Sequence, residues 1–155
     1  MPAKDVITAK DIMTRKTLTV TPEMPVIELA KFFLAHRISG APVVKEGRLL
    51  GLITEKELIE QKKRLHVPTV VAIMEAVVYL ESSKHFEQEL REIAASKVED
   101  LYQRRMATVS PDTPIEDIAT LMTEKGVALL PVVDENGGLA GIIGKADVVK
   151  AFLKP

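Results

Sequence analysis

A Thr-Val-Thr-Pro stretch at residues 19–22 returns as Thr-Val-Ser-Pro at residues 108–111, 89 positions further along the chain. The same offset aligns the Pro-Val-Val sequence at 42–44 with an identical one at 131–133. Agreement by chance across so many proline and apolar positions is improbable, and a repeat at a fixed offset indicates a duplicated structural unit. The sequence therefore predicts two copies of one unit of about 50 residues.

The alignment continues past the Pro-Val-Val sequences after one inserted residue, so that Gly-Leu-Ile at 51–53 matches Gly-Ile-Ile at 141–143. Between the copies lies a segment with no counterpart, in which a strongly apolar stretch after Pro68 and a stripe from Phe86 to Leu101 each predict a helix. The expected domains are residues 9–60 for the first repeat, 61–97 for a helical insertion and 98–153 for the second repeat.

Each copy is expected to contain a strand, a helix, two strands and a second helix. Apolar residues recur at helical spacing after Pro25 and Pro114, which suit the first helical position, with Thr113 as a good N-cap. Runs rich in β-branched residues, bounded by proline or by turn sequences, predict the strands. The expected strands are 17–21, 41–44 and 49–53 in the first copy and 106–110, 129–133 and 139–143 in the second; the last helices begin near Glu55 and near Lys145.

These elements predict an α/β (α+β) fold of two β-α-β-β-α repeats. A short sheet covered by helices on one face needs a partner for its other face, and the second copy supplies one. Either copy alone, at about 50 residues, would be marginally stable. The repeats are therefore expected to pack sheet to sheet with pseudo-twofold symmetry.

The composition excludes several classes of function. Hydrophobic residues make up 46% of the chain, which is enough for a core, and the net charge of −1 leaves no excess of positive charge for binding nucleic acid. There is no cysteine, which excludes disulfides, thiolate metal sites and cysteine nucleophiles. No apolar stretch approaches the roughly 18 residues of a membrane span, and no signal peptide is evident. We expect a cytoplasmic protein that does not bind membranes.

The repeated motifs resemble those of the cystathionine-β-synthase (CBS) domain, and their tandem resembles a Bateman module. The resemblance covers both repeats, about two-thirds of the chain, and the insertion is similar to that of small stand-alone bacterial members of this family. The motifs that carry it are Asp11-Ile12-Met13-Thr14, Ile38 to Val44 and Gly51 to Leu58 in the first copy, with Val127 to Val133 and Gly141 to Val148 in the second.

The resemblance implies a regulatory, energy-sensing module that binds AMP, ADP, ATP or S-adenosylmethionine in clefts between the two repeats, and not an enzyme. A helix N-terminus favours a phosphate group, and a carboxylate can accept hydrogen bonds from both ribose hydroxyls. Carried over by position, one cleft combines Met13, Thr14, Leu18, Ile38, Ser39 and Gly40 with Gly144 and Asp147; the other combines Tyr102, Ala107, Val127 and Ala128 with Thr54 and Glu57.

Neither cleft matches the family pattern completely. Gly144 stands where the pattern has a hydroxyl residue. Glu57 is longer than the usual aspartate by one methylene, which moves its carboxylate by roughly 1.5 Å. The cleft with Asp147 is therefore the favoured ligand site.

Structural roles also explain several of these residues without a ligand. The sequence Thr54-Glu55-Lys56-Glu57 is a capping box, and a carboxylate such as that of Asp147 is favourable in the first turn of any helix. Ser39-Gly40 fits a helix-ending turn with an unusual glycine conformation, and Pro42 and Pro131 fit strand starts. The alternative function is therefore a structural module with degenerate clefts.

No metal site or catalytic group is expected. His36, His66 and His85 lack the spacing of metal ligands, and the glycines form neither a P-loop nor a dinucleotide-binding motif. The apolar insertion helix needs a cover, from its own chain or from a second copy, and twofold dimers are the commonest soluble assemblies. We expect a homodimer that regulates an unknown protein partner.

Overall fold

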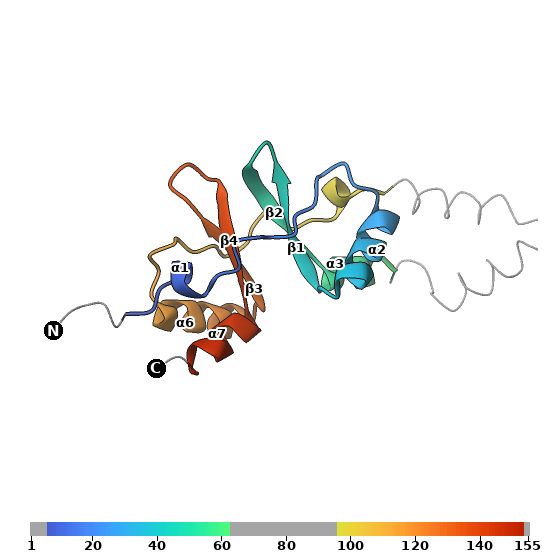
Figure 1. The fold of residues 1–155 in the computed structure, drawn as a ribbon. Helices are drawn as coiled ribbons and strands as arrows, with labels where there is room; N and C mark the ends of the chain where they lie inside the picture. The colour runs from blue at the N-terminus through green and yellow to red at the C-terminus, as the bar shows by residue number, and fades with distance from the viewer. Residues whose placement is uncertain (1–5, 63–95, 154–155) are drawn as a thin grey trace, which may run out of the picture. The chain divides into compact units, whose positions relative to one another are not determined.

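The computed structural model describes residues 6–62 and 96–153, which form the mixed α+β fold expected from the sequence (Figure 1). The chain divides into two compact units, and each takes segments from both halves of the sequence. Unit 1 comprises Met1–Thr19, Val44–Gly51 and Arg104–Pro155; unit 2 comprises Val20–Val43 and Leu52–Gln103.

Unit 1 is built around the antiparallel hairpin of β3 (Leu129–Val133) and β4 (Leu139–Gly144). The helices α6 (Ile115–Lys125) and α7 (Lys145–Ala151) accompany it, together with the short α1 (Ala9–Ile12) from the start of the chain (Figure 1). Its core contains Ala9, Ile12, Val109, Ile118, Leu130, Val132, Ile143, Val148 and Ala151.

Unit 2 repeats this plan with the other copy. The strands β1 (Gly40–Lys45) and β2 (Arg48–Thr54) form a second two-stranded sheet, whose hairpin end at 44–51 belongs to unit 1. The remaining elements are α2 (Val26–His36), α3 (Glu55–Lys62) and the 3-10 helix η2 (Val98–Asp100). Its buried apolar residues are Val20, Val26, Leu29, Phe33, Ala41, Val43, Leu52, Ile53 and Val98.

The segment that leads into each repeat pairs with the opposite repeat. In unit 1, Thr14 and Ile142 exchange backbone hydrogen bonds of 2.9 and 3.0 Å. In unit 2, Gln103 and Leu52 exchange equivalent bonds of 2.8 and 3.0 Å, and Gln103 lies 89 residues after Thr14. Each unit is therefore completed by a segment from the other copy.

Helices α2 and α6 each begin one residue later than expected. Pro25 and Pro114 are N-caps with extended backbone (ψ 143° and 150°), not first helical residues. The N–H of Ile115, which follows Pro114, donates to the Ile7 carbonyl at 2.9 Å, so an incoming chain segment satisfies this terminal N–H group. Thr113 is not the N-cap. Its Oγ1 instead accepts a hydrogen bond of 3.0 Å from the Ser110 N–H.

The first strand of each copy, expected at 17–21 and 106–110, is shortened to a single parallel bridge. The Val109 N–H donates to the Pro131 carbonyl at 3.1 Å, and the Val133 N–H donates to the Val109 carbonyl at 2.9 Å. The next hydrogen bond of this ladder would need an N–H group on residue 131, and proline has none. The runs therefore lie in extended backbone beside the expected strands, but each contributes one bridge and not a strand of five residues.

Two expected roles in the loops were wrong. The C-cap of α2 is Arg37 (φ 53°) and that of α6 is Gly126 (φ 63°), both in the left-handed conformation. This conformation directly follows the last helical residue, so it does not fall on Gly40. Gly40 in the Ser39-Gly40 sequence instead begins β1. Pro42 and Pro131 are the third residues of their strands, not the first.

The remaining expectation concerns the insertion. Most of residues 61–97, including the stretch after Pro68 and the stripe that begins at Phe86, lies outside the described residues. Within the described ranges, no helix combines the length and the apolar character that crossing a bilayer requires.

Candidate functional site

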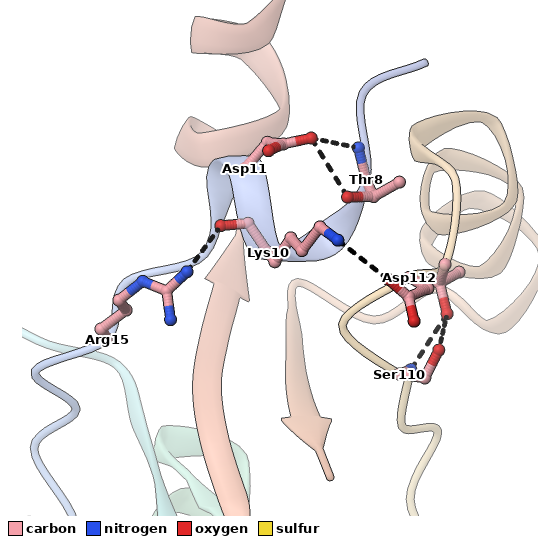
Figure 2. Close-up of polar contacts among 7 residues, drawn as sticks. Thr8, Lys10, Asp11, Arg15, Ser110 and Asp112 are labelled. Atoms are coloured by element: carbon pink, nitrogen blue, oxygen red, sulfur yellow. Dashed lines mark hydrogen bonds and ion pairs between the residues drawn. The ribbon is translucent and has the colours of Figure 1, made fainter. Parts of the chain in front are cut away.

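Polar contacts fasten the N-terminal segment to unit 1 (Figure 2). Asp11 Oδ2 accepts hydrogen bonds from the Thr8 backbone N–H at 2.9 Å and from the Thr8 hydroxyl at 3.1 Å. Lys10 Nζ forms an ion pair with Asp112 Oδ1 at 3.1 Å, and Arg15 donates to the Lys10 carbonyl at 3.4 Å. The Lys10–Asp112 ion pair joins this segment to the loop before α6, whereas the other contacts lie within the segment itself.

Beyond α1, the chain lies directly against β4. A Cβ atom on Gly141 would lie only 2.7 Å from Met13 Sδ and 2.8 Å from the Thr14 carbonyl oxygen. A side chain at this position would therefore push the segment away from the strand. Gly141 allows Met13 and Thr14, two of the predicted site residues, to approach the strand that leads to Gly144 and Asp147.

Asp147 lies in the first turn of α7 and is half-buried. Its Oδ2 accepts a hydrogen bond of 2.8 Å from the Gly144 N–H. Within the described part of the chain, its second oxygen, Oδ1, accepts no hydrogen bond. One carboxylate oxygen therefore remains available to an external donor.

The counterpart in unit 2 is different. Glu57 is buried, with 6% of its surface exposed. Its Oε2 accepts hydrogen bonds from the Thr54 N–H at 2.7 Å and from the Thr54 hydroxyl at 2.5 Å, while the Lys56 N–H donates to the Thr54 hydroxyl at 3.2 Å. The capping box expected from the sequence is therefore present, and the side-chain amide of Gln103 donates to the other oxygen, Oε1.

Gln103 did not stand out in the sequence, although its partner Glu57 did. Its only signal was its place 89 residues after Thr14, a predicted ligand contact. The pairing of Gln103 with Glu57 joins residues 46 positions apart, which no local pattern can indicate.

The residues predicted for each cleft belong partly to unit 1 and partly to unit 2. Inside unit 1, the carbonyl of Ala128 lies 4.0 Å from the Cβ position of Gly144; inside unit 2, the Ser39 carbonyl accepts a hydrogen bond of 2.8 Å from the Glu55 N–H. The complete composition of either cleft stays a prediction. Of the predicted residues, Met13, Thr14, Leu18, Ala107, Val127, Ala128, Gly144 and Asp147 belong to unit 1, and Ile38, Ser39, Gly40, Thr54, Glu57 and Tyr102 belong to unit 2.

The described residues contain no group of three or more histidine, aspartate or glutamate side chains that could hold a metal ion. The recognisable features are instead two equivalent helix-start carboxylates, one internally bonded and one with an available oxygen.

The CBS domain family model matches residues 9–64 and 98–154, which make up most of the chain. The chain therefore belongs to the CBS domain family and contains two CBS repeats. The protein MJ1426 of Methanocaldococcus jannaschii is 30% identical to it over 157 residues, covering 96% of this chain and 93% of that protein.

Solved CBS-pair structures share the fold. CBSX2 from Arabidopsis thaliana, in complex with AMP, matches with a TM-score of 0.73 at 24% identity and covers 94% of this chain and 96% of its own. The CBS domain pair of MJ0100, in complex with 5'-methylthioadenosine and S-adenosyl-L-methionine, matches with a TM-score of 0.66 at 23% identity, over 95% and 96% of the two chains.

Proposed function

We propose that this chain is a regulatory module that binds an adenosine-containing ligand, with AMP, ADP, ATP and S-adenosylmethionine as the candidates. The observation that carries the proposal is the available Oδ1 of Asp147, held in place by the hydrogen bond from Gly144 to Oδ2. The complexes of CBSX2 with AMP and of MJ0100 with S-adenosyl-L-methionine support the ligand class.

The surroundings of Asp147 suit such a ligand. An ionised carboxylate is a strong acceptor for the hydroxyl groups of a ribose. Asp147 Oδ2 and Leu129 Cδ1 lie 3.8 and 3.9 Å from the Cβ position of Gly144, so an apolar side chain is close to the carboxylate. Small-molecule sites commonly combine such apolar walls with a few polar groups that fix the ligand's orientation.

Isothermal titration calorimetry with each of the four candidates tests the proposal. At least one should bind, and Asp147→Ala should weaken its affinity about tenfold or more, because a hydrogen bond to a charged group contributes about 1.5–3 kcal/mol. Asp117→Ala is the matched control, since it removes an exposed carboxylate from the first turn of α6 in the same unit, and it should leave the affinity unchanged. An absence of binding with all four compounds, or an unchanged affinity in Asp147→Ala, contradicts the proposal.

The proposed regulatory action is a change in the packing of the repeats or subunits when the ligand binds. A ligand shifts such an equilibrium only by its difference in affinity for the two states. The partner that responds to this change would be a second copy of the chain or another protein.

A second candidate function is a dimerisation module with degenerate clefts. Two observations favour it: both oxygens of Glu57 already accept hydrogen bonds from the chain itself, and several large apolar side chains are exposed on helices or at a helix end. Exposed apolar surface often marks a protein interface. The side chains concerned are Ile27, Leu34, Ile59, Val149 and Phe152.

Native mass spectrometry of the purified protein separates the two functions. A sensor should carry or accept a nucleotide, whereas a purely structural dimer should have twice the chain mass and no added mass after incubation with nucleotides. We expect a dimer whose mass increases with added ligand. A dimer that never gains mass supports the structural function instead.

A further inference from the structure

The Glu57 carboxylate is enclosed by donors from its own chain. The Thr54 N–H and hydroxyl bind Oε2, and the Gln103 side-chain amide binds Oε1. Glu57 is 6% exposed, and no buried side-chain nitrogen or oxygen of the described residues lacks a partner. An incoming hydroxyl would therefore have to displace a donor that is already in place.

The equivalent carboxylate in unit 1 lacks this internal donor. Thr14 occupies the position of Gln103, and both residues form the same backbone bridge to the strand beside them. The Thr14 side chain is exposed and does not hydrogen-bond to Asp147 within the described residues. A threonine is shorter than a glutamine and carries no amide, so Oδ1 of Asp147 stays available.

We infer that the Gln103 side chain occupies the Glu57 carboxylate, closes that carboxylate to a ribose and limits the chain to one adenosine ligand, bound at Asp147. This inference rests on the proposed function. Its physical basis is that binding at Glu57 would break a buried hydrogen bond to a charged group before forming a new one. Binding at Asp147 breaks none.

The inference assigns Gln103 as the residue that determines which of the two duplicated sites accepts a ligand. The length of Glu57 contributes to this closure. Its side chain is one methylene longer than that of Asp147, and its carboxylate contacts the side-chain amide of Gln103. Placing threonine at position 103 and aspartate at position 57 should therefore open the second carboxylate to a ligand, and placing glutamine at position 14 should close the first.

The first test is calorimetry with AMP on the full chain. The unmodified protein should bind one AMP per chain. The double variant Gln103→Thr/Glu57→Asp, which copies unit 1 into unit 2, should bind two. Thr14→Gln, which places an amide beside Asp147, should weaken binding of AMP at least tenfold, and Thr120→Gln, the same change on the exposed face of α6, should change the affinity less than twofold.

Three results would overturn the inference. Binding of two AMP molecules by the unmodified chain would show that Glu57 is not closed, and a double variant that still binds one would show that Gln103 is not what closes it. Loss of AMP binding in Gln103→Thr, with no effect of Thr14→Gln, would show that the ligand binds at Glu57 and not at Asp147.

A second test needs no ligand, so it distinguishes failure of this inference from failure of the proposed function. Urea unfolding midpoints are measured by circular dichroism for Gln103→Ala, Glu57→Ala and the double variant, with Gln103→Thr as a milder change. Coupled side chains should give a double-variant shift clearly smaller than the two single shifts together. Additive shifts would contradict the pairing even in a chain that binds AMP, whereas coupled shifts in a chain that binds no nucleotide would refute only the sensor function.

Discussion

Gly141 and Gly144 lie three residues apart in β4 and have opposite tolerances for a side chain. An added Cβ at Gly141 would meet Met13 Sδ at 2.7 Å and a backbone oxygen at 2.8 Å. At Gly144 the nearest atom would lie at 3.8 Å, which is ordinary contact. At the scale of single residues, the close approach of the leading segment to β4 depends on Gly141.

We therefore expect Gly141→Ala to lower the free energy of unfolding by about 1–3 kcal/mol, as overpacking does when a backbone atom must move. Gly144→Ala should change it by less than about 1 kcal/mol, because the gain from a less flexible unfolded chain and the loss of a preferred N-cap residue oppose each other. Urea denaturation of both variants checks this. Equal effects of the two substitutions would show that the approach at Gly141 is looser than described.

At the scale of elements, sequence periodicity was sufficient for α2, α6 and the four strands of the two hairpins, because each has a continuous apolar pattern of its own. It was insufficient where an element is completed from elsewhere in the chain. Pro114 stays extended because the segment before α1 supplies the Ile7 carbonyl to the first helical N–H. The capping role of Thr54 could be predicted because its contacts are local. The role of Gln103 could not, because Gln103 lies in the leading segment of one repeat and contacts Glu57 of the other.

At the scale of the whole molecule, the exchange of leading segments makes the two repeats depend on each other. Ala9 and Ile12 belong to the core of unit 1 although the rest of that core follows residue 108, and Val98 is fully buried in unit 2. Removing either segment would leave apolar core residues exposed to water, and a single repeat of about 50 residues is only marginally stable. The duplicated sequence thus encodes one interdependent structure and not two autonomous domains.

The last prediction follows from this dependence. If the chain is divided within residues 63–95 and each half is produced alone, each half should give the circular dichroism spectrum of a largely unfolded chain. Mixing the halves should restore helical signal, because Thr14 can again pair with Ile142 and Gln103 with Leu52. The intact chain is the control, and concentration dependence of the recovered signal shows that the halves associate. A C-terminal half that unfolds cooperatively by itself, with the midpoint of the intact chain, would mean that the core of unit 1 does not need Ala9 and Ile12.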